Sequence, residues 1–142
     1  MEMKVCECGV RESAVIRGEY TITGEDYISA RKFPDAVCTA FYPIDLHEEN
    51  GPPLALQEGA VPQVPLRALR PRGSEFLPAA GRCISSDRKA DSALRVQASC
   101  MATAQASAAA ACISIRRKES LSRVPVEEVR ELLKEHNAIL PA

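Results

Sequence analysis

The sequence predicts a mixed α/β protein, of α+β type when the chain stands alone, from three observations. Short segments rich in β-formers, bounded by Gly and Pro, fill the first third of the chain. An uncharged, Ala-rich stretch at 97–115 is long enough for one helix. Near the C-terminus, Val126, Val129, Leu132 and Leu133 recur at helical spacing. A chain of 142 residues makes one domain or parts of two.

The first third of the chain is expected to be strands with one short helix. Arg17-Gly18 separates two β-rich segments and predicts a hairpin. Thr23, followed by two acidic residues, predicts the start of a short helix that Pro34 ends. The Pro- and Gly-rich stretch 48–65 is expected to be a surface loop. Strands are expected at 13–16, 19–22 and 36–41, with a short one allowed at 54–56.

The second half is expected to alternate extended segments with two helices. Segment 64–69 is expected to be an edge strand or extended chain, because Pro65 cannot donate to a ladder. A strand at 76–80 is expected to lead to a polar loop at 86–92 and then to a buried helix at 98–115. An amphipathic helix is expected at 126–136, after Pro125 and before a C-terminal cap at Asn137.

Composition excludes several classes of function. The net charge of -1 gives no electrostatic reason to expect nucleic acid or an anionic membrane as a partner. The first residues lack the apolar run of a signal peptide, so we expect a cytoplasmic protein with reduced thiols. Cys6-Glu7-Cys8 has a tighter spacing than zinc and iron–sulfur sites use. We therefore expect no metal site, with a Cys-based metal-binding module as a weak alternative.

One stretch is predicted to bind an anionic cofactor: the Gly81 turn and the start of the Ala-rich helix should converge on one common cavity, with Arg95 at its rim. Gly81 permits close backbone approach, and Arg82 and Arg95 add positive charge. The backbone N–H groups of Ala98, Ser99 and Cys100 open the Ala-rich helix, where free amides and the helix dipole favour an anion. The alternative interpretation makes Ser99 a simple helix cap and both arginines surface ion-pair partners.

Other catalytic signatures are sparse, and the catalytic residues stay unknown. Asp45 and His47 stand two residues apart, as a base with its orienting carboxylate would, although an exposed loop histidine shows the same pattern. The seven glycines nowhere form Gly-x-Gly-x-x-Gly, so these residues build no pyrophosphate cradle.

Several segments, in order, resemble the C-terminal region of the FAD-dependent oxidoreductases related to the flavin subunit of heterodisulfide reductase. The resemblance runs from about Gly9 to Leu140 and is carried by Gly18–Thr23, Arg31–Ala36, Tyr42–His47, Ala80–Ser85, Arg95-Val96 and Ser99–Ala102. It implies that residues 1–66 end a β-rich substrate-side domain, and that 67–142 close the FAD-binding domain, covering the flavin with the Ala-Gly-Arg turn and the helix after it.

The chain departs from that family at a few positions. Ala98 replaces a usual Pro, Ala104 and Ala108 replace Gly, and Arg88 replaces a His, which puts a proton-transfer role for that loop in doubt. Some relatives carry iron–sulfur clusters, but no Cys-x-x-Cys run supports one here.

The resemblance implies the end of an oxidoreductase that transfers hydride or electrons through FAD to or from a small-molecule substrate. The FAD site in this chain is incomplete, so an N-terminal half or a companion chain is expected as the partner. The alternative is a non-catalytic remnant, or a subunit that docks on a separate FAD-binding chain.

Overall fold

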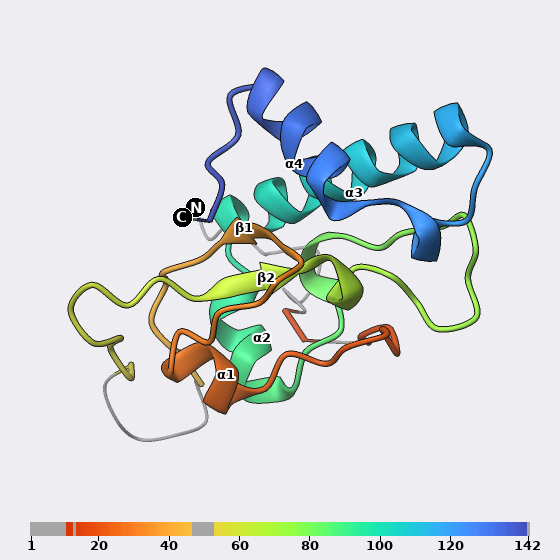
Figure 1. Cartoon of the computed structure of the whole chain (residues 1–142). Helices are drawn as coiled ribbons and strands as arrows, with labels where there is room; N and C mark the ends of the chain where they lie inside the picture. The colour runs from red at the N-terminus through yellow and green to blue at the C-terminus, as the bar shows by residue number, and fades with distance from the viewer. Residues whose placement is uncertain (1–10, 13, 47–52, 142) are drawn as a thin grey trace, which may run out of the picture.

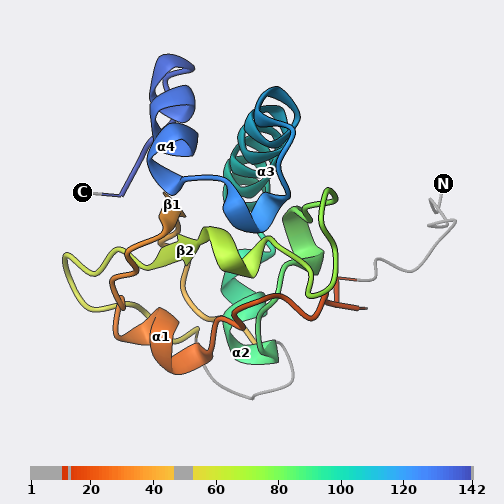
Figure 2. The same cartoon turned by 45° about the vertical axis from the view of Figure 1, so that its right-hand side comes forward.

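The computed structural model describes residues 11–12, 14–46 and 53–141. In both views, α3 and α4 lie on one side of the β1–β2 pair and α1 and α2 lie on the other (Figure 1, Figure 2). Helices and a two-stranded sheet make the protein mixed α/β, as predicted. The elements are α1 (Gly24–Ile28), β1 (Ala36–Thr39), β2 (Gln63–Pro65), the 3-10 turns η1 (Leu66–Ala68) and η2 (Gly81–Cys83), α2 (Arg88–Leu94), α3 (Gln97–Arg117), the 3-10 turn η3 (Leu121–Arg123) and α4 (Val126–Glu135).

The small sheet is completed by a side chain from α4. β1 and β2 pair antiparallel, with Ala36 opposite Pro65, which has no N–H to donate. Arg130 donates from Nε to the Ala36 carbonyl at 2.9 Å and from Nη2 to the Pro34 carbonyl at 2.8 Å. The C-terminal helix is thereby fastened to the strand at the start of the sheet.

The predicted start of α1 is confirmed. The Thr23 hydroxyl accepts from the Asp26 amide at 3.1 Å, and the Asp26 carboxylate accepts from the Thr23 amide at 3.1 Å. This reciprocal capping box satisfies two amides that the first helical turn leaves without partners. Tyr20 and Arg31 also donate to the Asp26 carboxylate, which lowers the pKa of Asp26 against the opposing effect of its burial.

The expected hairpin around Arg17-Gly18 is wrong. Its two arms do not pair with each other; the chain from 16 to 22 bonds instead to residues 67–86, through bridges such as Gly18 to Pro71 and Ile22 to Ser86. Gly18 marks a close crossing rather than a turn, since a Cβ there would lie 2.6 Å from Ser85 Cβ. The short local pattern did not reveal these distant partners.

The expected loop at 86–92 is also wrong, because it forms α2. Asp87 is the N-cap of α2: its carboxylate accepts from the Ala90 amide at 2.8 Å and from the Gly24 amide at 2.8 Å. The expected strand at 76–80 is extended chain that joins no ladder, and the residues after β2 turn into η1. The expected strand at 36–41 is confirmed over the bounds of β1.

Two sides of α3 have different surroundings. On its buried side, Thr103 Oγ1 accepts from the Gly81 amide at 3.0 Å and Ser107 donates to the Ala79 carbonyl at 2.7 Å. On its other side Met101 and Ile115 are 72% and 76% exposed. The helix was expected to be buried in a complete enzyme and only half covered in this chain, and half covered is what the described residues show. Its length and apolar composition would suffice to cross a bilayer, and 44% of that apolar window is buried within the described part of the protein.

The C-terminal helix matches its prediction closely. Pro125 is the N-cap of α4, and Asn137 adopts a left-handed φ of 57° just beyond its end. Val129 and Leu133 are buried in the core. That core is one cluster containing residues from before and after position 66, such as Val64 and Leu94. The division into segments 1–66 and 67–142 stays a prediction.

Candidate functional site

The turn at Gly81 lies against the first turns of α3. Gly81 has a left-handed φ of 78°, and a Cβ built on it would lie 4.0 Å from Cys100 Sγ. The hydrogen bond from Gly81 to Thr103 fixes this neighbourhood. The expectation that the Gly81 turn and the start of α3 converge, although about twenty residues separate them, is therefore confirmed.

The start of α3 differs in detail from the expected one. The helix begins at Gln97 with Val96 as N-cap and has no side-chain cap, so the interpretation of Ser99 as the cap is wrong. The Cys100 amide donates to the Val96 carbonyl at 3.0 Å. Cys100 therefore offers no free amide. Ala98 and Ser99 belong to the first turn of the helix, whose N–H groups have no acceptor within the helix.

The two arginines occupy different environments. Arg95 is the C-cap of α2; its side chain is only 7% exposed and forms an ion pair with Glu12. It also donates to the Asp45 carbonyl at 3.3 Å. The expected position of Arg95 at the rim of a cavity is therefore wrong, because internal acceptors hold its guanidinium. Arg82 is exposed on η2, where its positive charge acts on Asp91 and Cys100.

Asp91 is a buried carboxyl in the same neighbourhood. The residue is 5% exposed, and its Oδ1 has no hydrogen-bond partner among the described residues. Burial raises the pKa of Asp91 to about 6, opposed by Arg95 and Arg82 and reinforced by Glu12. Burial also raises the pKa of the Cys100 thiol. The Gly81 side of α3 thus combines a left-handed glycine, an exposed arginine and a carboxyl that is costly to ionise.

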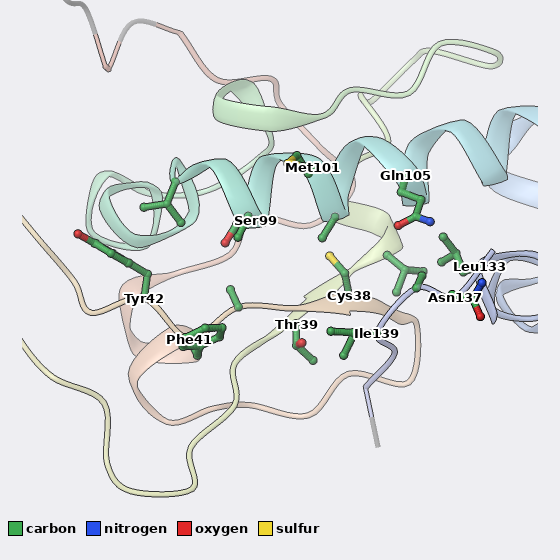
Figure 3. A pocket seen from close by; sticks show the side chains of 16 residues that line it. Cys38, Thr39, Phe41, Tyr42, Ser99, Met101, Gln105, Leu133, Asn137 and Ile139 are labelled. Carbon is green, nitrogen blue, oxygen red and sulfur yellow. The ribbon is translucent and has the colours of Figure 1, made fainter.

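A pocket of about 480 Å³ lies on another side of α3 (Figure 3). β1 and the residues after it form one wall, the first half of α3 another, and the chain after α4 the third. Ala98 and Ser99 line this pocket, whereas Gly81, Arg82, Arg95 and Cys100 do not. The expectation of one common cavity is wrong: the start of α3 separates a glycine turn from an apolar pocket.

This pocket was not predicted from the sequence. Its α3 wall is made by Ala98, Met101, Ala102 and Gln105, which recur at helical spacing and so share one face. The helical spacing of the α3 wall is visible in the sequence. The opposite walls, at 39–42 and 137–139, come from distant segments, and no local pattern indicates that they face α3.

No group of three or more potential metal ligands occurs within the residues that the structure describes. Cys38, Cys83, Cys100 and Cys112 are free thiols, and burial raises the pKa of Cys38 to about 12. Cys6, Cys8 and His47 lie outside the described residues.

The fold is a mixed α/β segment in which the start of α3 has a glycine turn on one side and an apolar pocket on another. The model of the family described as FAD dependent oxidoreductase matches residues 4–133, and the chain belongs to that family. Membership implies FAD as the cofactor. A search of curated proteins and a search of solved structures each found no match.

Proposed function

We propose that this chain is the closing segment of an FAD-dependent oxidoreductase, with the Gly81 turn and the first turn of α3 covering the flavin. The observation that carries the proposal is the position of the Gly81 turn against the start of α3, where the Gly81 amide donates to Thr103, within a chain that the family model matches from 4 to 133. A glycine of left-handed φ beside an uncapped helix start lets a ligand approach the backbone closely.

The residues present fit one half of FAD and not the other. Among the described residues, only Cys100 Sγ would lie within 4 Å of a Cβ added at Gly81, so this part of the turn leaves room for a ligand. The first-turn amides of α3, including those of Ala98 and Ser99, have no side-chain cap. The adenosine half requires a pyrophosphate cradle at a strand-to-helix turn, and no Gly-x-Gly-x-x-Gly occurs in this sequence.

Bound FAD supplies hydride or electron transfer, and the protein positions it. The α3 amides and the positive end of the helix dipole favour negative charge on the part of the ligand that faces them. Arg82 adds a cation on the Gly81 side, and the internal contacts of Arg95 hold α2 against the segment near Asp45. Arg95 then acts as a positioning residue.

The domain division, the source of the adenosine-binding part, the substrate and the location belong to the same proposal. Residues 67–142 would close the FAD-binding domain and 1–66 would end a substrate-side domain, as in relatives of the flavin subunit of heterodisulfide reductase. The adenosine grip would come from a separate N-terminal half or a companion chain. We further propose a small-molecule substrate and a cytoplasmic location, with neither nucleic acid nor a membrane as partner.

A comparison of FAD with riboflavin tests the proposal. If the chain holds only the flavin half, it should bind both weakly and with similar affinity, measured by quenching of flavin fluorescence. Gly81→Val should abolish this binding, because a β-branched residue resists a positive φ and fills the turn. Gly73→Val is the matched control, since Gly73 has a φ of 79° but open space around it.

Three outcomes contradict the proposal. Tight stoichiometric binding of FAD at low micromolar concentration would show that an adenosine grip exists in this chain. Equal loss of binding in both valine variants would remove the Gly81 turn from the site. No flavin binding at the highest soluble concentration would contradict the covering role of the Gly81 turn.

A second function is a non-catalytic subunit or truncated remnant that docks on an FAD-binding chain. The exposed side of α3, with Met101 and Ile115, favours it. Flavin absorbance separates the two functions: a complex of this chain with its partner that reduces its flavin on substrate addition supports the oxidoreductase, and a flavin that stays oxidised supports the docking role.

A further inference from the structure

The pocket between β1 and α3 carries a separate inference. Its lining contains no charged residue, although a quarter of the sequence is Asp, Glu, Lys or Arg (26%). Its volume of about 480 Å³ falls within the range of small-molecule sites, roughly 300–1,000 Å³. Val37, Ala102, Leu133 and Ile139 give it apolar walls. A charged ligand would lose its hydration there without gaining an ion pair.

A few polar groups line the same walls. Ser99 is 4% exposed and lines the pocket. In Figure 3 its oxygen points from α3 into the pocket. A hydroxyl on the wall of an apolar pocket can donate to a ligand acceptor, and such a matched hydrogen bond adds affinity. Two carboxamides also line the pocket, Gln105 from α3 and Asn137 from the chain after α4.

We propose that this pocket binds an uncharged, flat, apolar molecule whose carbonyl oxygen accepts a hydrogen bond from Ser99. The apolar walls of β1 and α3 hold the ring system, and Ser99 fixes one end of it. The inference deepens the proposed function by naming a substrate class for the site, and it rests on that function only in calling the ligand a substrate.

The geometry places this ligand next to the flavin without sharing its contacts. Ser99 belongs to the pocket, whereas Cys100, its neighbour along the helix, faces Gly81. The start of α3 therefore stands between the ring system in the pocket and the proposed flavin position. Binding in the pocket requires no flavin, which allows it to be tested on the chain alone.

Methionine NMR provides the test, because one of the three methionines, Met101, lines the pocket. The chain is labelled with [¹³C-methyl]methionine, and the Met101 signal is assigned from Met101→Leu. The probe is 6-propionyl-2-dimethylaminonaphthalene, an uncharged, flat aromatic ketone. A saturable 1:1 shift of the Met101 methyl is expected, and no shift up to the solubility limit of the probe overturns the inference.

Two variants on α3 locate the binding. Ala102→Phe fills the pocket and should abolish the shift, while Ala104→Phe lies outside its lining and should preserve it. Equal behaviour of the two variants overturns the inference. Circular dichroism checks folding, and Gln105→Trp, at an exposed position of the lining, replaces Ala102→Phe if that variant unfolds.

The matched ligand 2-dimethylaminonaphthalene, which lacks the carbonyl, tests Ser99. Ser99→Ala should weaken the ketone about 2- to 10-fold, the effect of one hydrogen bond, and leave the carbonyl-free ligand unchanged. An equal loss for both ligands refutes the role of Ser99. Excess FAD should not displace the ketone; displacement would assign the pocket to the cofactor. Failure of flavin binding with intact ketone binding would refute the proposed function and leave the pocket in place.

Discussion

Replacing Asp91 by Asn should make the protein more stable at neutral pH. Burial raises the pKa of Asp91 from 3.8 to about 6, because its Oδ1 lies in a position without a hydrogen-bond partner among the described residues. A raised carboxyl pKa means that the folded state binds the proton more tightly than the unfolded state. The shift corresponds to about 3 kcal/mol, at 1.36 kcal/mol for each pKa unit.

The sign of this effect sets the pH window. The favourable contribution is complete below the unfolded pKa of 3.8 and is lost as the pH rises through about 6. Wild type should therefore lose about 2.4 kcal/mol between pH 4 and pH 7 relative to Asp91→Asn. Arg95, Arg82 and Glu12 surround the carboxyl and are present in both proteins, so the comparison isolates Asp91.

Urea unfolding followed by far-UV circular dichroism measures the difference at several pH values. Glu58→Gln is the control, since Glu58 is an exposed carboxyl in a turn. Asp26 and Asp35, whose pKa values are lowered, contribute equally to both proteins and cancel. A stability difference between wild type and Asp91→Asn that does not change from pH 4 to pH 7 would refute the reasoning.

Three further predictions concern packing. Thr23→Ala removes one half of the capping box and should cost about 1 kcal/mol in urea unfolding; no change would show that Asp26 alone holds the turn. Arg130→Ala should cost about 1–3 kcal/mol, with little rescue by Lys, because two carbonyls accept from its planar fork; full rescue by Lys would contradict this. The exposed side of α3 should make the chain self-associate, and the double variant Met101→Lys, Ile115→Lys should be more nearly monomeric in sedimentation velocity; a monomeric wild type would argue for a self-sufficient domain.

The helices were the most predictable part of the fold. Thr23 with its two following acids, the uncharged run of α3 and the apolar spacing of α4 are local signals, so the sequence determined them directly. Asp87 carried the same kind of signal for α2, but the charged and polar residues after it resemble a loop. The expected hairpin at Gly18 failed because its real partners, Pro71 and Ser85, are more than fifty residues away.

The candidate site was predictable in part. The closeness of Gly81 to α3 followed from the order of the segments that resemble the family. The side of the helix on which each residue lies did not, because Ser99 and Cys100 are neighbours in sequence and face different surroundings. Arg95 shows the same limit: its ion pair is with Glu12, which no local pattern indicates.

The hydrogen bonds of Arg130 bear on how the chain folds during synthesis. Ala36 lies opposite a proline that has no N–H, and its carbonyl accepts from a residue 94 positions later. At about 5–20 residues per second, a ribosome makes that stretch in roughly 5–20 s, and until then the N-terminal strand has not gained this contact. During synthesis, the Ala36 carbonyl therefore gains its Arg130 donor only after α4 has been made. Chains released before Arg130 are expected to keep an incomplete sheet and to be preferred substrates for chaperones and proteases.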